Sequence, residues 1–74
     1  MPLTLLQAGK TARVVTVNGG NGINSRLASM GIYPGSFLTL SRGGSGGPMI
    51  VQTGDSRYGL GRGMAHRIMV EPVE

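Results

Sequence analysis

The sequence predicts a small all-β domain in which five short strands close partly into a barrel, with one short helix inserted between the first two strands. Short apolar runs are separated by glycine-rich turns, which is typical of strands and turns rather than of a disordered chain. A single segment carries apolar residues at helical spacing. Residues 1–74 are expected to form one domain. Five strands laid flat in so short a chain would leave open edges, which partial closure removes.

The first predicted strand covers residues 11–17, where Val and Thr are enriched, as they are in strands generally. A short apolar stretch and a turn at residues 7–10 precede it. Asparagine and glycine at residues 18–22 end it, because both residue types tolerate a positive φ. With a turn on each side, the first strand of the sheet is expected to begin near residue 11 and to end near residue 17.

The next segment has the pattern of a helix. Ile23, Leu27 and Met30 recur at spacings of four and three, which places them on one face of a helix of about two turns. So short a helix is unstable alone in water, so this face must dock on the strands. Two alternative capping asparagines and one terminating glycine flank the helix: Asn21, Asn24 and Gly31.

The rest of the chain alternates turns and strands. Pro34 followed by Gly35 is the signature of a type II turn, because Pro fixes the first φ and Gly supplies the positive second one. The remaining strands are predicted at residues 36–42, 49–53, 56–61 and 67–73. They are joined by a glycine-rich loop, a tight reversal and a small crossover, at residues 43–48, 54–55 and 63–66.

Composition limits the class of protein. The absence of cysteine excludes disulfide bridges, thiolate metal sites and a cysteine nucleophile. Seven basic residues against three acidic ones give a net charge of +4, but the basic residues are scattered singly. The aromatic residues are too few to form a stacking platform for single strands. The charge therefore permits a nucleic-acid partner without indicating one, and we expect none.

Nothing in the sequence indicates a membrane segment or a leader. No apolar stretch reaches the roughly 18 residues of a membrane-spanning helix. The N-terminus lacks the charged leader and the long apolar region of a signal peptide. We therefore expect a cytoplasmic protein.

Candidate catalytic and metal-ligating residues are few. His66 is the only histidine, and a metal site around it would need carboxylates from Asp55, Glu71 or Glu74, which nothing in the sequence brings together. No serine lies in a Gly-x-Ser-x-Gly elbow, and the glycine-rich loop at 43–47 lacks the Gly-Lys-Ser/Thr of a phosphate-binding loop. We therefore expect no enzyme activity, no catalytic residue, no cofactor and no metal site within one chain. A weak site shared between two chains stays open.

The most specific feature is the segment at residues 26–35, where a short amphipathic helix, a capping glycine and a Pro-Gly turn follow one another. This segment resembles the FeoA family, small proteins tied to the Feo ferrous iron transport system. The family's Arg/Lys-Leu and apolar-Gly-apolar-x-Pro-Gly pattern is matched by Arg26, Leu27, Met30, Gly31, Ile32, Pro34 and Gly35. Further matches are Leu6, Gly9, the Gly-Gly-Pro at residues 46–48, Leu60, Gly61, Ala65, Ile68 and Val70. The resemblance therefore covers essentially the whole chain.

The resemblance implies an SH3-like barrel and a cytoplasmic accessory role in ferrous iron uptake. The implied partner is FeoB, the large membrane Fe(II) transporter, bound at its cytosolic GTP-binding region so that transport is modulated. The protein would then meet the membrane only through this partner. Our predicted contact residues are Arg26, Leu27, Met30, Ile32 and Tyr33. Leu27 and Met30 have the alternative of lying wholly in the core, and for Leu27 the two alternatives are evenly balanced.

Two other functions stay open at this stage. A nucleic-acid-binding small barrel would bind DNA or RNA with an affinity that falls steeply as salt rises. Domains similar to FeoA form the C-terminal part of iron- and manganese-dependent repressors, so a stand-alone metal-sensing module is the other alternative. Such a module would use His66 and carboxylates, across a weak homo-oligomer, and calorimetry with Fe(II), Mn(II) and Zn(II) before and after His66→Ala distinguishes it.

Overall fold

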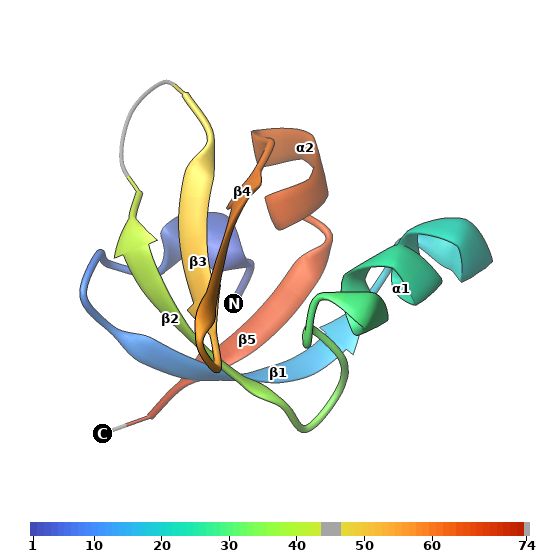
Figure 1. Cartoon of the computed structure of the whole chain (residues 1–74), viewed down its shortest axis with the longest axis horizontal. Coiled ribbons are helices and arrows are strands. Elements are labelled where there is room, and N and C mark those ends of the chain that lie inside the picture. Colours follow the sequence, from blue (N-terminus) through green and yellow to red (C-terminus); the bar gives the residue numbers. More distant parts are fainter. Residues whose placement is uncertain (44–46, 74) are drawn as a thin grey trace.

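The computed structural model describes residues 1–43 and 47–73. A single sheet is built from five strands: β1 (Thr11–Val17), β2 (Phe37–Arg42), β3 (Met49–Thr53), β4 (Ser56–Leu60) and β5 (Ile68–Pro72). The helical elements are a short 3-10 helix, a ten-residue helix and a single helical turn: η1 (Leu3–Leu5), α1 (Gly20–Ser29) and α2 (Arg62–Ala65). Figure 1 shows α1 between β1 and β2 in the chain, beside the barrel and not inside it.

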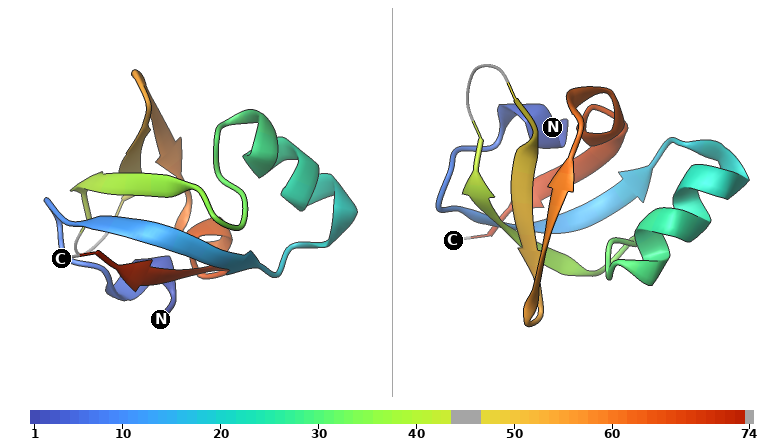
Figure 2. Two further views of the ribbon diagram at one scale, coloured as in Figure 1. Left: turned by 90° about the horizontal axis from the view of Figure 1, so that it is seen from below. Right: turned by 45° about the horizontal axis from the view of Figure 1, so that its top comes forward.

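All strand pairs are antiparallel, and the sheet has the order β4-β3-β2-β1-β5. The sheet is strongly curved, so that β3 and β4 run across β1 and β5 in Figures 1 and 2. Register shifts between Val14 and Thr16 and between Leu40 and Arg42 mark irregularities of the kind that bend strands. The predicted five-stranded, partly closed barrel with one inserted helix is confirmed.

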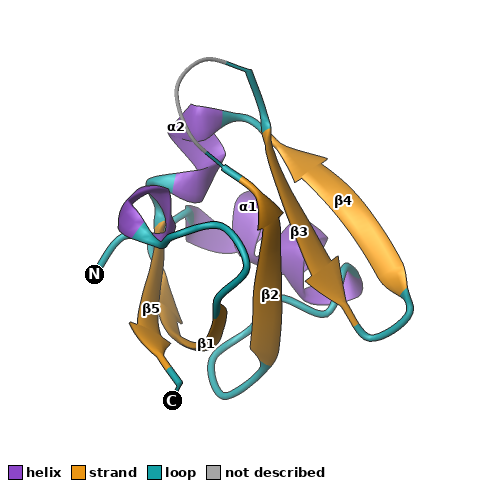
Figure 3. Cartoon of the chain, turned by 90° about the vertical axis from the view of Figure 1, so that its left-hand side faces the viewer, coloured by secondary structure: helices purple, strands orange, loops and turns teal. Residues whose placement is uncertain are grey.

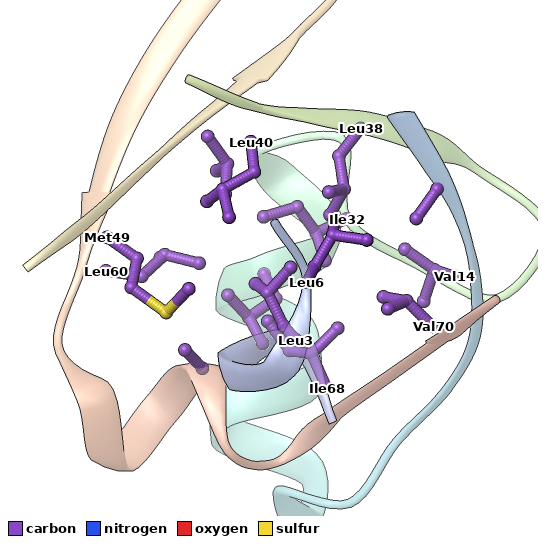
Figure 4. Close-up of a cluster of buried hydrophobic side chains, with 14 of the residues drawn as sticks. Leu3, Leu6, Val14, Ile32, Leu38, Leu40, Met49, Leu60, Ile68 and Val70 are labelled. Atoms are coloured by element: carbon purple, nitrogen blue, oxygen red, sulfur yellow. The ribbon is translucent and has the colours of Figure 1, made fainter. Parts of the chain in front are cut away.

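The core lies on the concave side of this sheet. Alternate residues of each strand point inward, as the burial of Val14, Leu38, Leu40, Val51 and Val70 shows. The helical elements add Leu3, Leu27 and Ala65, each with no exposed surface. In Figure 4, Leu3 and Leu6 lie in the middle of the cluster, between residues of different strands. Among the described residues, no polar or charged residue is buried.

The first residues of the chain pair with the outer edge of β5. The Met1 amino group donates a hydrogen bond to the Val70 carbonyl at 2.9 Å, and the Val70 N–H donates to the Met1 carbonyl at 2.7 Å. Pro2 forms an isolated bridge with Met69. The edge of β5 is therefore covered by the chain's own N-terminal segment.

The predicted element boundaries are close to those observed. β1 and β3 match the predicted ranges, whereas β2, β4 and β5 are each one or two residues shorter. The helix is longer than the predicted two turns because it begins at Gly20, with Gly19 as its N-cap. Capping by Asn21 is wrong, and Asn24 acts differently from the prediction, since its Oδ1 accepts a hydrogen bond from the Gly19 N–H at 3.2 Å. The predicted loop at 43–48 lies partly outside the described residues.

Candidate partner-binding groove

The end of α1 is fixed by a capping motif that involves Gly31. The Ile32 N–H donates to the Leu27 carbonyl at 2.9 Å, and the Gly31 N–H donates to the Ala28 carbonyl at 3.0 Å. Gly31 has φ +83°, the left-handed conformation that this motif requires. The apolar contact that usually accompanies the motif is provided here by Leu27 and Ile32, both fully buried. Gly31 therefore ends the helix as the sequence predicts.

A side chain of β3 holds the end of α1 in place. The Thr53 hydroxyl donates a hydrogen bond of 2.7 Å to the Met30 carbonyl, in a partly buried position. The approach is close, because a Cβ on Gly31 would lie 3.2 Å from the Thr53 Oγ1. The C-terminal end of α1 and the β3–β4 hairpin are therefore joined directly.

The turn that follows is held from two sides. The Ser36 N–H donates to the Tyr33 carbonyl at 2.9 Å, and Gly35 has φ +95°, as the predicted Pro-Gly turn requires. The Ser36 hydroxyl donates to the Tyr33 carbonyl and accepts from the Tyr33 N–H, at 2.7 and 3.0 Å. Two backbone hydrogen bonds of 2.8 Å, from Gly35 to Val14 and from Val14 to Ser36, attach the turn to β1.

An open groove of about 520 Å³ lies between these fixed segments. Its walls are the end of α1, the Pro-Gly turn and the β3–β4 hairpin, and its lining residues are Ser29, Met30, Gly31, Tyr33, Gly35, Ser36, Phe37, Thr53, Gly54 and Tyr58. The list includes all three aromatic residues of the chain. Tyr33 is 50% exposed and Phe37 is 55% exposed, whereas Tyr58 is half-buried against the core. Aromatic surface gathered at one rigid place is typical of a binding site.

The structure divides the predicted contact residues. Tyr33 and Met30 line the groove, and Arg26 is exposed one helical turn before Met30 without lining it. Leu27 and Ile32 have no exposed surface. For Leu27 the alternative of lying wholly in the core therefore holds, and for Ile32 the prediction that it offers contact surface is corrected. The reason is the capping motif, which turns both side chains into the core.

Three residues that line the groove were not predicted from the sequence: Phe37, Thr53 and Tyr58. Phe37 follows the Pro-Gly turn, at a strand position where the alternation with buried Leu38 leaves it outward, so the pattern contained a signal for it. No such signal exists for Tyr58, because the curvature of the sheet brings β4 to the turn before β2.

A second hollow, of about 360 Å³, lies between the N-terminal segment and the end of β5. Its exposed apolar residues are Met1, Leu5 and Val73.

In the described part of the chain, the residues considered as metal ligands do not lie together at one site. His66 is exposed after α2, and Asp55 lies in the β3–β4 turn. Glu71 forms an ion pair of 2.9 Å with Arg13, and Glu74 lies outside the described residues. Within residues 1–43 and 47–73, no three His, Cys, Asp or Glu residues form a group that could hold a metal ion. The shared site between two chains stays a prediction.

Comparison with known proteins identifies the family. The FeoA domain model matches residues 1–72, nearly the whole chain. The chain belongs to the FeoA family. This FeoA chain is 41% identical to "Putative Fe(2+) transport protein A" of Methanocaldococcus jannaschii, over 99% of this chain and 88% of that protein. Among the helices of residues 1–43 and 47–73, none has the length and hydropathy that a membrane-spanning helix needs.

Solved FeoA structures share the fold. A crystal structure of the iron uptake regulatory protein FeoA aligns with a TM-score of 0.91 at 33% identity, covering 99% of this chain and 97% of that one. Zinc-bound FeoA of Stenotrophomonas maltophilia, described as a procaryotic SH3 domain protein, aligns with a TM-score of 0.83 at 29% identity, covering 96% of this chain and 89% of that one. The SH3-like barrel expected from the resemblance is therefore shown.

Proposed function

We propose that this FeoA protein is a cytoplasmic accessory protein of ferrous iron uptake that binds the cytosolic part of a FeoB-type transporter and modulates its activity. Membership of the FeoA family and the similarity to a named Fe(2+) transport protein support the iron-uptake role. The aromatic groove is the observation that supports binding through this face. Its exposed aromatic surface is large for a chain with three aromatic residues.

The groove suits an apolar or aromatic side chain, or a proline, of the partner. Tyr33 and Phe37 provide broad rings, and few torsions must be fixed to hold them. The walls are fixed before binding by the Thr53–Met30 bond and by the attachment of the turn to β1. A preorganised site loses less entropy on binding than one that must be ordered. Arg26, exposed beside this surface, would contact the rim of the partner.

Co-purification with the FeoB-type transporter tests the proposal. Tyr33→Ala and Phe37→Ala remove exposed side chains from the groove, and each is expected to weaken binding about tenfold or more, as for buried aromatic anchors of other interfaces. The matched control is Leu5→Ala, which removes a side chain that is 65% exposed and lies at the second hollow. Circular dichroism and urea unfolding check that each variant is folded.

The outcomes separate two surfaces. Weakened binding in both groove variants, with unchanged binding of Leu5→Ala, supports the proposal. Unchanged binding in the groove variants, with loss in Leu5→Ala, would place the contact at the second hollow and overturn the assignment. Iron uptake by cells that carry the same variants then reports whether the contact modulates transport.

A further inference from the structure

The convex face of β2, β3 and β4 presents an ordered array of side chains. The strand registers place Arg42, Ile50 and Gly59 in one cross-strand row. The neighbouring row holds Thr11, Thr39, Gln52 and Arg57. These residues belong to the strand positions opposite to the inward-pointing core residues. Figure 3 shows β2, β3 and β4 in front, with α1 behind them, so this face carries no covering helix.

The charge on this face is unbalanced. Arg42 and Arg57 are both exposed, and neither forms an ion pair or a side-chain hydrogen bond with any other described residue. Arg13, in the row beyond Thr11, differs because its guanidinium contacts Glu71 at 2.9 Å. The face therefore offers two guanidinium groups that have no ion-pair partner within residues 1–43 and 47–73, in a chain whose net charge is already +4.

The spacing of these two arginines is compatible with an extended ligand. Arg42 and Arg57 lie two strands apart and are offset by two residues, because Gly59, and not Arg57, lies in the row of Arg42. With strands about 4.8 Å apart and about 3.3 Å per residue, their Cα atoms are about 12 Å apart. In an extended peptide, two side chains four residues apart are separated by about 13 Å and point the same way. Two carboxylates at that spacing would meet both guanidinium groups.

The surroundings favour a protein segment over a nucleic acid. Ile50 lies next to Arg42 and provides aliphatic surface. Gln52 and Thr39 add polar surface, although the Gln52 amide already donates to the Gly54 carbonyl at 3.3 Å and the Thr39 hydroxyl is paired with Thr11 at 2.8 Å. No aromatic side chain lies in either row, so no base could stack between the arginines. Two phosphate contacts are also few compared with the six to ten or so of a typical DNA-binding protein.

We propose that the convex face of β2–β3–β4 binds an extended acidic segment of a protein partner, with carboxylates on Arg42 and Arg57. This inference goes beyond the proposed function, because it concerns a second surface and holds for any protein that carries such a segment. A partner that occupied both surfaces would have an apolar group in the groove and an acidic segment across the sheet.

A titration of the isolated chain with a capped octaglutamate peptide, followed by amide NMR, tests this proposal. Shift changes are expected at residues 39–42, 50–52 and 57–59, and the affinity is expected to fall as salt rises. The double variant Arg42→Gln/Arg57→Gln should weaken binding about fivefold, as expected for the loss of two exposed ion pairs. The matched control, Arg62→Gln/Arg67→Gln, lowers the net charge equally but lies outside this face, and its affinity should change less than about twofold.

Each outcome decides for or against the proposal. An equal loss in both double variants would mean that net charge alone attracts the peptide, and shift changes confined to other elements would exclude this face. If an oligothymidylate of equal charge binds the same residues more tightly than the peptide does, the ligand of this face is a nucleic acid and the proposal of a protein segment is overturned. If the double variant does not fold, Gln52→Glu places a carboxylate between the arginines and should weaken peptide binding. The co-purification of the groove variants is independent of this titration, so the two proposals can fail separately.

Discussion

Gly31 meets two requirements that no other residue type meets together. Its φ of +83° disfavours any side chain, and a Cβ would press on Thr53 at 3.2 Å. Gly31→Ala is therefore expected to lower the free energy of unfolding by about 1–3 kcal/mol, measured by urea denaturation. Gly35→Ala isolates the strain, because Gly35 has φ +95° but open space around its Cβ position. A loss in Gly35→Ala as large as in Gly31→Ala would show that the Thr53 contact adds nothing.

At the same scale, the burial of individual residues of α1 could be predicted only in part. The spacing of Ile23, Leu27 and Met30 correctly predicts the docked helix face, but it cannot say which residues lie at the edge of that face. Met30 is the C-cap, so its side chain lies where the helix ends and lines the groove. Leu27, three residues earlier, is fully buried. The burial of each follows from the direction in which α1 docks, which the sequence alone does not contain.

At the scale of elements, one side chain joins α1 to the β3–β4 hairpin. Thr53→Val keeps the shape of the side chain but removes the donor of the 2.7 Å bond to the Met30 carbonyl. We expect the free energy of unfolding to fall by about 0.5–1.5 kcal/mol, and amide hydrogen exchange to accelerate at Gly31 and Ile32. The exposed Thr39 hydroxyl, paired with Thr11 at 2.8 Å, gives the control. A Thr39→Val effect equal to that of Thr53→Val would refute the special role of Thr53.

The strands were more predictable than the helix. Glycine, proline and asparagine mark the ends of β1 and β3 so clearly that local turn chemistry suffices for their boundaries. The observed start of α1 at Gly20 precedes the predicted one, because Gly19 and Gly20 are weak helix formers and give no local signal for a helix. The helix is held instead by its docked end. The part of the groove formed by α1 and the Pro-Gly turn could be predicted, because these residues are close in sequence. Its wall from β4 depends on the curvature of the whole sheet.

At the scale of the whole molecule, η1 fills the open side of the curved sheet. Leu3 is fully buried, whereas Leu5 in the same element is 65% exposed. Leu3→Ala is therefore expected to cost about 2–5 kcal/mol of unfolding free energy, because it leaves a cavity in the core. Leu5→Ala should change the stability by less than about 0.5 kcal/mol. Thermal and urea unfolding of the two variants compare them directly, and similar losses would contradict a core role for η1.

The pairing of β1 with β5 also has a consequence for how the chain folds. β2, β3 and β4 are consecutive antiparallel strands, so their contacts close short loops. The ion pair between Arg13 and Glu71 instead joins residues 58 positions apart. Contacts between distant residues form late, because the entropy of closing a long loop must be lost first. We therefore expect the meander of β2–β4 to assemble early, while β1 keeps one unpaired edge until the last strand emerges and closes it.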